Sequence, residues 1–311
     1  AAALTQRLML EWRQGERSSF APYLPFVSTD AVPPEHPILW LLEGEELTQR
    51  LLEAIGSLAM VSPDLEQSLR TMLEDQLATQ SQADVRLANA VVESRAFDVG
   101  NRPVLCPLLD LLNHWVGPQS LGSPKTPPCR FKVRGKDVIM VAERQIQPEE
   151  ELQHAYRNHS SLELLLQYGF VPEHNVFQSV NLFLLPLAAD DVDLHQVLIE
   201  RGWTDPTQPV KVVLPADGVT GDGNTRPGPG MPILQRLLMG PPLEPDLEEQ
   251  VQQLIISWLH IVMECYEEAI DEVKFTFSCG DAPAPARLET FLLRLLASER
   301  DVVASELASV V

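Results

Sequence analysis

Three polar side chains interrupt or close an apolar run near the middle of the chain. Residues 94–115 read SRAFDVGNRPVLCPLLDLLNHW, in which Asp110 lies inside the run and Asn113 and His114 end it. Burying such groups without a hydrogen bond costs about 1–3 kcal/mol each. They therefore satisfy one another inside a core, or they face a ligand, and the sequence makes them candidates for a binding site.

Two tyrosines follow in residues 154–175, HAYRNHSSLELLLQYGFVPEHN. Tyr156 closes a strand predicted at 150–156. Tyr168 lies at the end of a helix predicted at 160–169, which Gly169 terminates. Two tyrosines at the ends of neighbouring elements either pack in a core or frame a site, and neither decides the question by itself.

Other motifs that carry chemistry are weak or missing. The Gly-rich residues 216–231 lack the Lys-Ser/Thr pair of a phosphate-binding loop, and their acidic residues do not follow EF-hand spacing. His154 and His159 would diverge on a helix, which makes them poor partners for a metal ion. No GxSxG sequence of a serine hydrolase occurs. We therefore expect no metal site.

Composition limits the partners of the chain. With 311 residues and 45% hydrophobic content, it can form two domains, or one large domain with an appendage. A net charge of −21 argues against nucleic-acid binding, which relies on clustered Lys and Arg. In residues 186–311, acidic side chains outnumber basic ones by 21 to 8. These residues form solvated helix faces, or they attract a basic partner.

The cysteines and the longest apolar runs indicate a protein of a reducing compartment without a membrane span. The four cysteines are far apart and form no CxxC pair, which excludes a zinc framework of that kind and a disulfide-dense scaffold. No apolar run approaches the roughly 20 residues of a membrane helix. Residues 254–263 instead predict a buried helix, and no signal peptide is present.

The predicted elements give an α+β fold. Helices are expected at 2–14 and within 45–92, and a hairpin at 130–142 turns at Gly135. A strand is expected at 176–185, and the remainder is mostly helical. This order of helices, short strands and helices differs from the alternating pattern of a parallel α/β sheet.

These segments together resemble one family. The order SRAF, PLLDLLNHW, ELQHAY and LLLQYGFV is similar to the SET-domain protein methyltransferases, in the branch of the Rubisco large-subunit lysine methyltransferase. That branch has SRxF, P-x-x-D-x-x-N-H, a strand ending in Tyr, and LLxxYGF followed by Asn. The matching residues are Ser94, Arg95, Phe97, Pro107, Asp110, Asn113, His114, Tyr156, Tyr168, Gly169, Phe170 and Asn175. The resemblance at the level of motifs covers about residues 94–181.

The resemblance implies three parts. Residues 93–186 would form the C-terminal half of a SET-domain β core. Residues 1–92 would be its helical insert, in which ERSSFAPYLPFV is similar to an S-x-W-x-x-Y-L segment of the branch. Residues 187–311 would be an all-α lobe that binds the substrate.

It also implies a cofactor and a substrate. The cofactor would be S-adenosylmethionine and the acceptor a lysine on another protein, with no metal ion. Asn113 would lie near the amino-acid end of the cofactor and the His114 backbone against its adenine. Ser94 and Arg95 would contact the cofactor and the channel. Asp110 would line the lysine channel or anchor the knot-like crossing of the fold, chiefly through its carbonyl group.

Tyr156 matches the catalytic tyrosine of the family, which also contacts the cofactor. A phenol with an ordinary pKa near ~10 is a poor base at neutral pH, so we expect Tyr156 to orient the reacting groups while the proton leaves to water. Tyr168 would form a wall of the channel with Phe170 behind it. Glu163, before Tyr168, is expected to be a surface or structural partner.

One part of the family pattern has no counterpart before residue 94. The branch begins with a Gly-rich GxG strand and turn that holds the methionine end of the cofactor. Either that segment lies outside this sequence, or the chain is an inactive scaffold that binds a partner protein as a subunit of a larger complex. A third alternative keeps the enzyme but replaces lysine with histidine as acceptor. The branch has chloroplast, cytosolic and nuclear members, so the resemblance leaves the compartment open.

Overall fold

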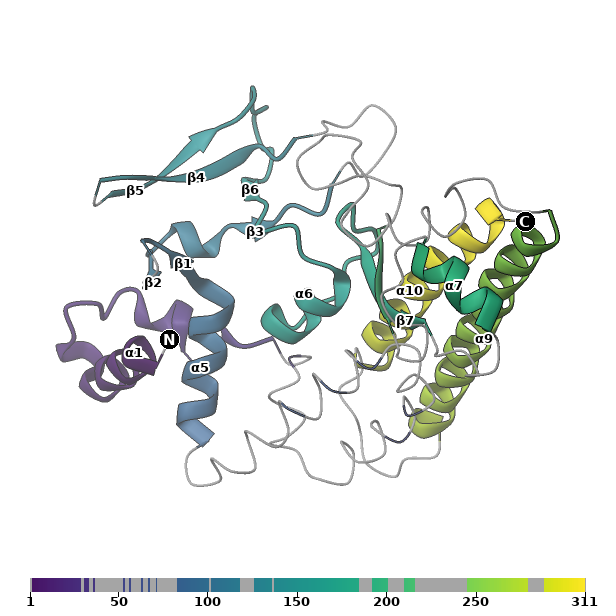
Figure 1. Ribbon diagram of the computed structural model, residues 1–311. Coiled ribbons are helices and arrows are strands. Elements are labelled where there is room, and N and C mark those ends of the chain that lie inside the picture. The colour runs from purple at the N-terminus through teal and green to yellow at the C-terminus, as the bar shows by residue number, and fades with distance from the viewer. Residues whose placement is uncertain are drawn as a thin grey trace. The chain divides into compact units, whose positions relative to one another are not determined.

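The computed structural model describes residues 2–28, 31–33, 36, 53, 56, 63, 67, 71, 83–100, 102–117, 126–135, 137–184, 192–200, 210–215, 245–278 and 288–310 (Figure 1). By its contacts the chain divides into two compact units. The first is Ala1–Gly44 with Met72–Asn175, and the second is Glu45–Thr71 with Val176–Val311. The domain boundaries predicted near residues 92 and 186 stay predictions.

Two helices of the first unit, α1 (Ala2–Gln14) and α5 (Ala83–Arg95), pack side by side (Figure 1). The helix predicted at 2–14 is confirmed. Of the helical region predicted at 45–92, most residues lie outside the described part, and α5 forms its end. The buried side chains between these helices are apolar: Leu8, Val27, Val32, Ala88, Ala90, Val91 and Val92.

Short 3₁₀ turns follow α1 and fold back on it. They are η1 (Gly15–Arg17) and η2 (Leu24–Val27). The indole Nε1 of Trp12 donates to the carbonyl O of Val27 at 3.0 Å, which ties η2 to α1. Tyr23 immediately precedes η2, so this bond also fixes the position of its side chain.

Small sheets complete the first unit. The strands are β1 (Ala96–Asp98), β2 (Pro103–Leu105), β3 (Asn113–His114), β4 (Cys129–Arg134), β5 (Asp137–Ala142) and β6 (Gln153–His154). β1 and β2 pair antiparallel, and the other four have the order β3-β6-β4-β5, in which β6 runs parallel to both β3 and β4. The predicted hairpin is confirmed as β4 and β5, joined at Gly135, whose φ of 63° suits glycine. The 3₁₀ turn η5 (Leu109–Leu111) leads into β3.

The strand predicted at 150–156 is shorter than expected. Only Gln153 and His154 pair as β6, so Tyr156 lies beyond the strand rather than closing it. The reason is that the Tyr156 N–H donates to a side chain, Nδ1 of His114, instead of continuing the ladder. The helix predicted at 160–169 is confirmed as α6 (Ser161–Tyr168).

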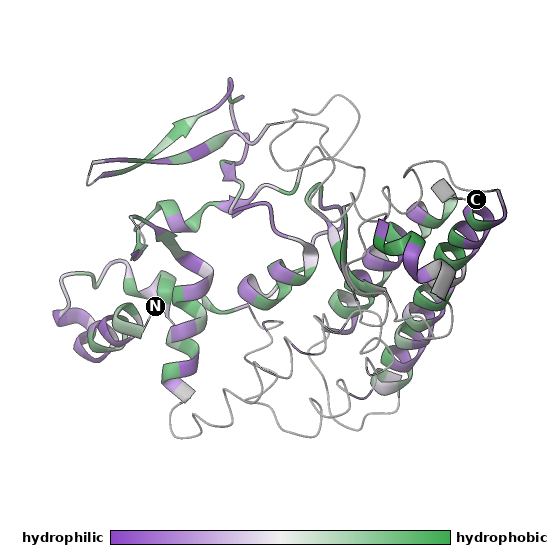
Figure 2. Cartoon of the chain, in the orientation of Figure 1, coloured by the Kyte–Doolittle hydropathy of each residue, from purple (hydrophilic) through white to green (hydrophobic). Residues whose placement is uncertain are grey.

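The second unit is mostly helical, as predicted, and holds α7 (Val192–Glu200), α9 (Pro245–Ser278) and α10 (Leu288–Val310). Its strand β7 (Ser179–Leu184) lies within the strand predicted at 176–185. It pairs antiparallel with β8 (Val210–Pro215), which was not predicted, although its run of β-branched residues favours a strand. Residues of both hydropathy classes alternate along α9, which packs its apolar face on α10 (Figure 2).

The remaining predictions concern the membrane and the cysteines. No described helix combines the length and apolar composition that a membrane span requires, and residues 254–263 lie within α9. Cys106, Cys129 and Cys265 are free thiols. Cys279 and the Gly-rich residues 216–231 lie outside the described residues.

Candidate active site

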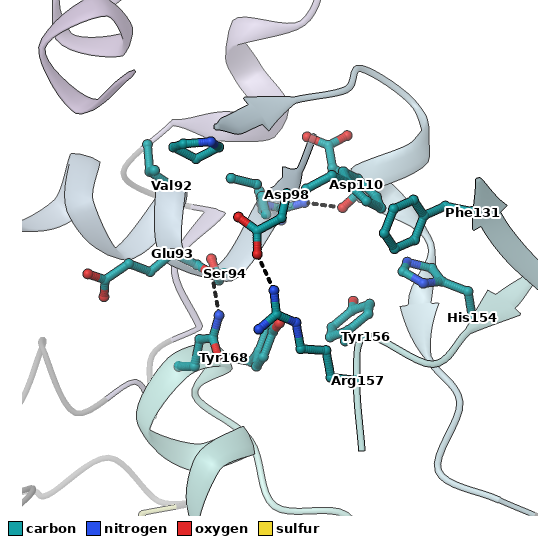
Figure 3. Close-up of a pocket in the computed structure, with 15 residues that line it drawn as sticks. Val92, Glu93, Ser94, Asp98, Asp110, Phe131, His154, Tyr156, Arg157 and Tyr168 are labelled. Carbon is teal, nitrogen blue, oxygen red and sulfur yellow. Dashed lines mark hydrogen bonds and ion pairs between the residues drawn. The ribbon is translucent and has the colours of Figure 1, made fainter. Parts of the chain in front are cut away.

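A cavity of about 300 Å³ lies in the first unit, at the end of α5 (Figure 3). This volume is at the lower end of the range for small-molecule pockets. Residues predicted for the site from three separate segments line it: Ser94, Arg95, Asp110, Tyr156 and Tyr168. Aromatic and charged side chains supply much of the remaining wall, including Phe97, Asp98, Phe131, His154 and Arg157.

The Tyr156 hydroxyl is fixed by the backbone, because it donates to the carbonyl O of Leu112 at 2.9 Å. Its ring centroid lies 4.7 Å from that of Tyr168 and 5.0 Å from the ring centroids of His114 and His154. Burial raises the pKa of Tyr156 to about 12. The hydroxyl therefore stays protonated near neutral pH, which suits positioning rather than proton abstraction.

Tyr168 owes its place to the two ends of α6. At the start, Ser160 Oγ accepts from the Glu163 N–H at 3.3 Å and Glu163 Oε2 accepts from the Ser160 N–H at 2.7 Å, a reciprocal capping box. At the end, Gly169 takes the left-handed conformation with φ of 75°. Glu163 is thus the structural partner that the sequence indicated. Burial, and secondarily the neighbouring Tyr156, raise the pKa of Tyr168.

Ser94 and Arg95 form the last turn of α5. The Ser94 hydroxyl donates to the Ala90 carbonyl O at 2.7 Å, within the helix. Arg95 reaches out of the helix instead, and its Nη1 donates to the carbonyl O of Asp110 at 2.9 Å. The guanidinium therefore joins α5 to η5 across the wall of the cavity.

Asp110 makes different contacts with its backbone and its side chain. The carbonyl O receives Arg95, while the carboxylate Oδ2 accepts a hydrogen bond from the Tyr23 hydroxyl. The residue is 7% exposed, and Oδ1 has no hydrogen-bond partner among the described residues. Burial raises the pKa of Asp110. Sequence reasoning missed Tyr23 as a partner, because the two residues are 87 positions apart.

Asn113 and His114 do not line this cavity. Asn113 is exposed, and its Nδ2 donates to Glu151 Oε1 at 2.6 Å. His114 is buried and accepts the Tyr156 N–H on Nδ1 at 3.0 Å. Burial, aided by the charges of two other histidines, lowers the pKa of His114 to about 4. The structure thus joins His114 to Tyr156 and leaves the Asn113 amide at the surface.

Phe170 lies behind Tyr168, with ring centroids 6.4 Å apart. At the edge of the cavity Arg157 forms an ion pair with Asp98 (Figure 3). Within the described ranges no group of three His, Cys, Asp or Glu side chains is arranged to hold a metal ion.

Comparisons with known proteins bear on the fold. No protein-family model matches the sequence, and no curated protein matches it either. Among solved structures, the SET domain of LSMT bound to lysine and AdoHcy matches with a TM-score of 0.50 and 16% identity, over 97% of this chain and 74% of that one. Rubisco LSMT bound to AdoMet matches with a TM-score of 0.50 and 16% identity, over 99% of this chain and 75% of that one.

The chain has an LSMT-like SET fold. A further structure, Rubisco LSMT bound to sinefungin and monomethyllysine, agrees, with a TM-score of 0.50 and 17% identity over 97% of this chain and 72% of that one. Identities this low show a shared fold. The α+β class, the SET core and the helical C-terminal lobe are therefore confirmed. The family branch and the roles of the individual site residues remain proposals.

Proposed function

We propose that this protein is an S-adenosylmethionine-dependent protein methyltransferase that modifies lysine. The observation that supports this most directly is the convergence of α5, η5 and the two tyrosines on one cavity. There the Tyr156 hydroxyl is held by the Leu112 carbonyl, and its ring faces Tyr168. Residues far apart in the sequence that match the motifs of one enzyme family thus meet at a single place.

The residues present fit this cofactor. Its sulfonium is a cation, and the aromatic rings of Phe131, Tyr156 and Tyr168 offer faces that attract cations. Arg95 would serve the carboxylate of the methionine moiety, since a guanidinium pairs well with a carboxylate. The Asn113 amide, exposed beside β6, would donate or accept at the amino-acid end.

Bound S-adenosylmethionine would supply an activated methyl group. In the transfer, the amine lone pair forms a nitrogen–carbon bond while the carbon–sulfur bond breaks and leaves its electron pair on sulfur. The acceptor must therefore arrive as a neutral amine, having lost its proton to water. Burial among aromatic side chains disfavours the ammonium form and so helps this loss. Tyr156, protonated up to a pKa of about 12, would orient the amine and the methyl group.

Lysine suits this cavity because its long apolar stem can lie along aromatic walls while its nitrogen reaches the polar end. The solved structures support the choice, because LSMT was crystallised with lysine and with monomethyllysine. The protein that carries the lysine is proposed to be basic, because acidic side chains predominate in residues 186–311.

A transfer assay tests the function. The purified full-length protein is incubated with methyl-labelled S-adenosylmethionine and candidate acceptor proteins, and the modified residue is identified by mass spectrometry. We expect label on a lysine side chain. Label on histidine would keep the enzyme and change the acceptor. The absence of both transfer and calorimetric cofactor binding would contradict the proposal and leave a SET-fold scaffold subunit.

A further inference from the structure

The turn that precedes β3 is held from three sides. The Asp110 carboxylate accepts from the Tyr23 hydroxyl, and its carbonyl O accepts from Arg95 at 2.9 Å. Two residues later, the Leu112 carbonyl O accepts from the Tyr156 hydroxyl at 2.9 Å. Two groups of the proposed site, a guanidinium and a phenol, therefore hang on carbonyls of one short turn, and Tyr23 is the third contact on it.

That turn has little stability of its own. η5 is a 3₁₀ turn of three residues, and the bonds at its end are long, at 3.4 Å from the Leu111 N–H to the Leu108 carbonyl and 3.3 Å from the Leu112 N–H to the Leu109 carbonyl. Leu108, which begins it, has φ of 75° although it carries a side chain, a conformation that costs roughly 1–2 kcal/mol. Leu108 is also 73% exposed, so packing does not hold it. The position of the turn must depend on its outside contacts.

Tyr23 supplies the contact to the buried carboxylate. Asp110 is buried, and Oδ2 is the carboxylate oxygen for which the structure gives a side-chain donor. A hydrogen bond to a charged acceptor is about twice as strong as a neutral one, and its loss inside the protein is costly. Trp12 fixes the segment of Tyr23 by its bond to Val27. The chain of contacts thus runs from the α1 region, through Tyr23 and Asp110, to the carbonyl that holds Tyr156.

We propose that Tyr23 is a positioning residue for methyl transfer: by anchoring Asp110, it sets the place of the Leu109–Leu112 turn and of the Tyr156 hydroxyl. Tyr23 does not line the cavity, so it acts through Asp110 rather than on the reactants. The inference rests on the proposed function. It adds a residue from the N-terminal helical segment to a site otherwise built from residues 94–170.

The test compares two Tyr→Phe variants that remove the same kind of bond. Tyr23→Phe removes the hydroxyl that anchors Asp110. Tyr266→Phe, the matched control, removes a hydroxyl that donates to the buried carboxylate of Glu299 at 2.9 Å, within the core of the second unit. Both keep the aromatic ring. We expect Tyr23→Phe to lower kcat roughly tenfold, because small misplacements of reacting groups are costly, while the KM for acceptor and the Kd for cofactor stay within twofold. Tyr266→Phe should leave kcat within twofold of wild type.

A double variant separates positioning from a general loss of structure. If Tyr23 acts through the Leu112 carbonyl on Tyr156, adding Tyr23→Phe to Tyr156→Phe should change the remaining rate by less than twofold. Independent, multiplicative losses would overturn the inference, as would a Tyr23→Phe enzyme with the kcat of wild type.

A second variant covers a failure of Tyr23→Phe to fold. Asp110→Asn replaces the charge-assisted bond by a weaker neutral one, and we expect it to lower kcat at least threefold with cofactor affinity unchanged. A wild-type kcat in Asp110→Asn would overturn the inference in that case. If the wild-type protein transfers methyl groups and the Tyr23 variant is unimpaired, only this inference fails; if the wild type transfers none, the proposed function fails and the inference falls with it.

Discussion

The backbone N–H of Tyr156 donates to Nδ1 of His114 at 3.0 Å. A backbone N–H can only donate, so Nδ1 must carry a lone pair, and the ring is neutral with its proton on Nε2. Burial lowers the pKa of His114 to about 4, which agrees with a neutral ring. The same bond ends the strand before Tyr156 and so sets where the phenol begins.

This neutral histidine predicts a stability that falls in mild acid. Between the unfolded pKa of about 6.5 and the folded pKa of about 4, the unfolded chain binds a proton that the folded chain does not. Stability from this group is therefore complete above about pH 7 and declines as the pH falls toward 4, by about 2 kcal/mol between pH 7.5 and pH 5. Urea denaturation at the two pH values measures this.

The matched variant is His114→Asn, whose side-chain oxygen can still accept the Tyr156 N–H. Burial lowers the pKa of His36 to about 4 as well, so wild type and variant share that contribution. We expect the variant to lose less stability than wild type over this interval, by about 2 kcal/mol. Equal losses in the two proteins would show that His114 is not buried in the neutral form.

Gly169 is predicted to be irreplaceable for two reasons at once. Its φ is 75°, and a Cβ at this position would lie 2.8 Å from Cβ of His36. Gly169→Ala should therefore cost about 3 kcal/mol, from backbone strain and from the clash together. Gly135 has a φ of 63° but open space around it, so Gly135→Ala should cost only about 1 kcal/mol. Thermal unfolding of both variants gives the comparison, and similar losses would contradict the close approach of His36.

Local signals in the sequence predicted much of the fold because their causes are local. The α6 helix was predicted from its apolar spacing and its terminal glycine, and the hairpin from Gly135 between two β-rich runs. Both depend on neighbours within a few residues. β8 was not predicted, because its partner β7 lies about thirty residues earlier and its pattern is short.

The site was predictable only in part, for the same reason. Family motifs selected Asp110 and Tyr156, and both line the cavity. The bond from Tyr23 to Asp110 joins residues 87 positions apart, and no local pattern announces it. The end of β6 before Tyr156 depends on a tertiary bond to His114 and was likewise out of reach.

Asn113 gives a prediction about the cofactor. Its exposed amide donates to Glu151 at 2.6 Å, and the proposed function assigns it to the amino-acid end of S-adenosylmethionine. Asn113→Ala should weaken cofactor binding about tenfold, the loss expected for one good hydrogen bond to a charged group, with little change in stability. Titration calorimetry measures the Kd.

The control for this variant is Asn89→Ala. Asn89 accepts from the Thr5 hydroxyl at 2.7 Å between α1 and α5, away from the cavity. It should bind the cofactor as wild type does. Unchanged affinity in Asn113→Ala would remove that residue from the cofactor site.

The central claim is that the Tyr156 phenol orients a methyl transfer inside this cavity. A single-turnover measurement with Tyr156→Phe tests it most directly, because the full-length protein is preloaded with labelled S-adenosylmethionine and mixed with acceptor, so that product release does not enter. We predict a transfer rate about 100-fold or more below wild type, with cofactor still bound. A rate equal to that of wild type would contradict the role of Tyr156 and the site built around it.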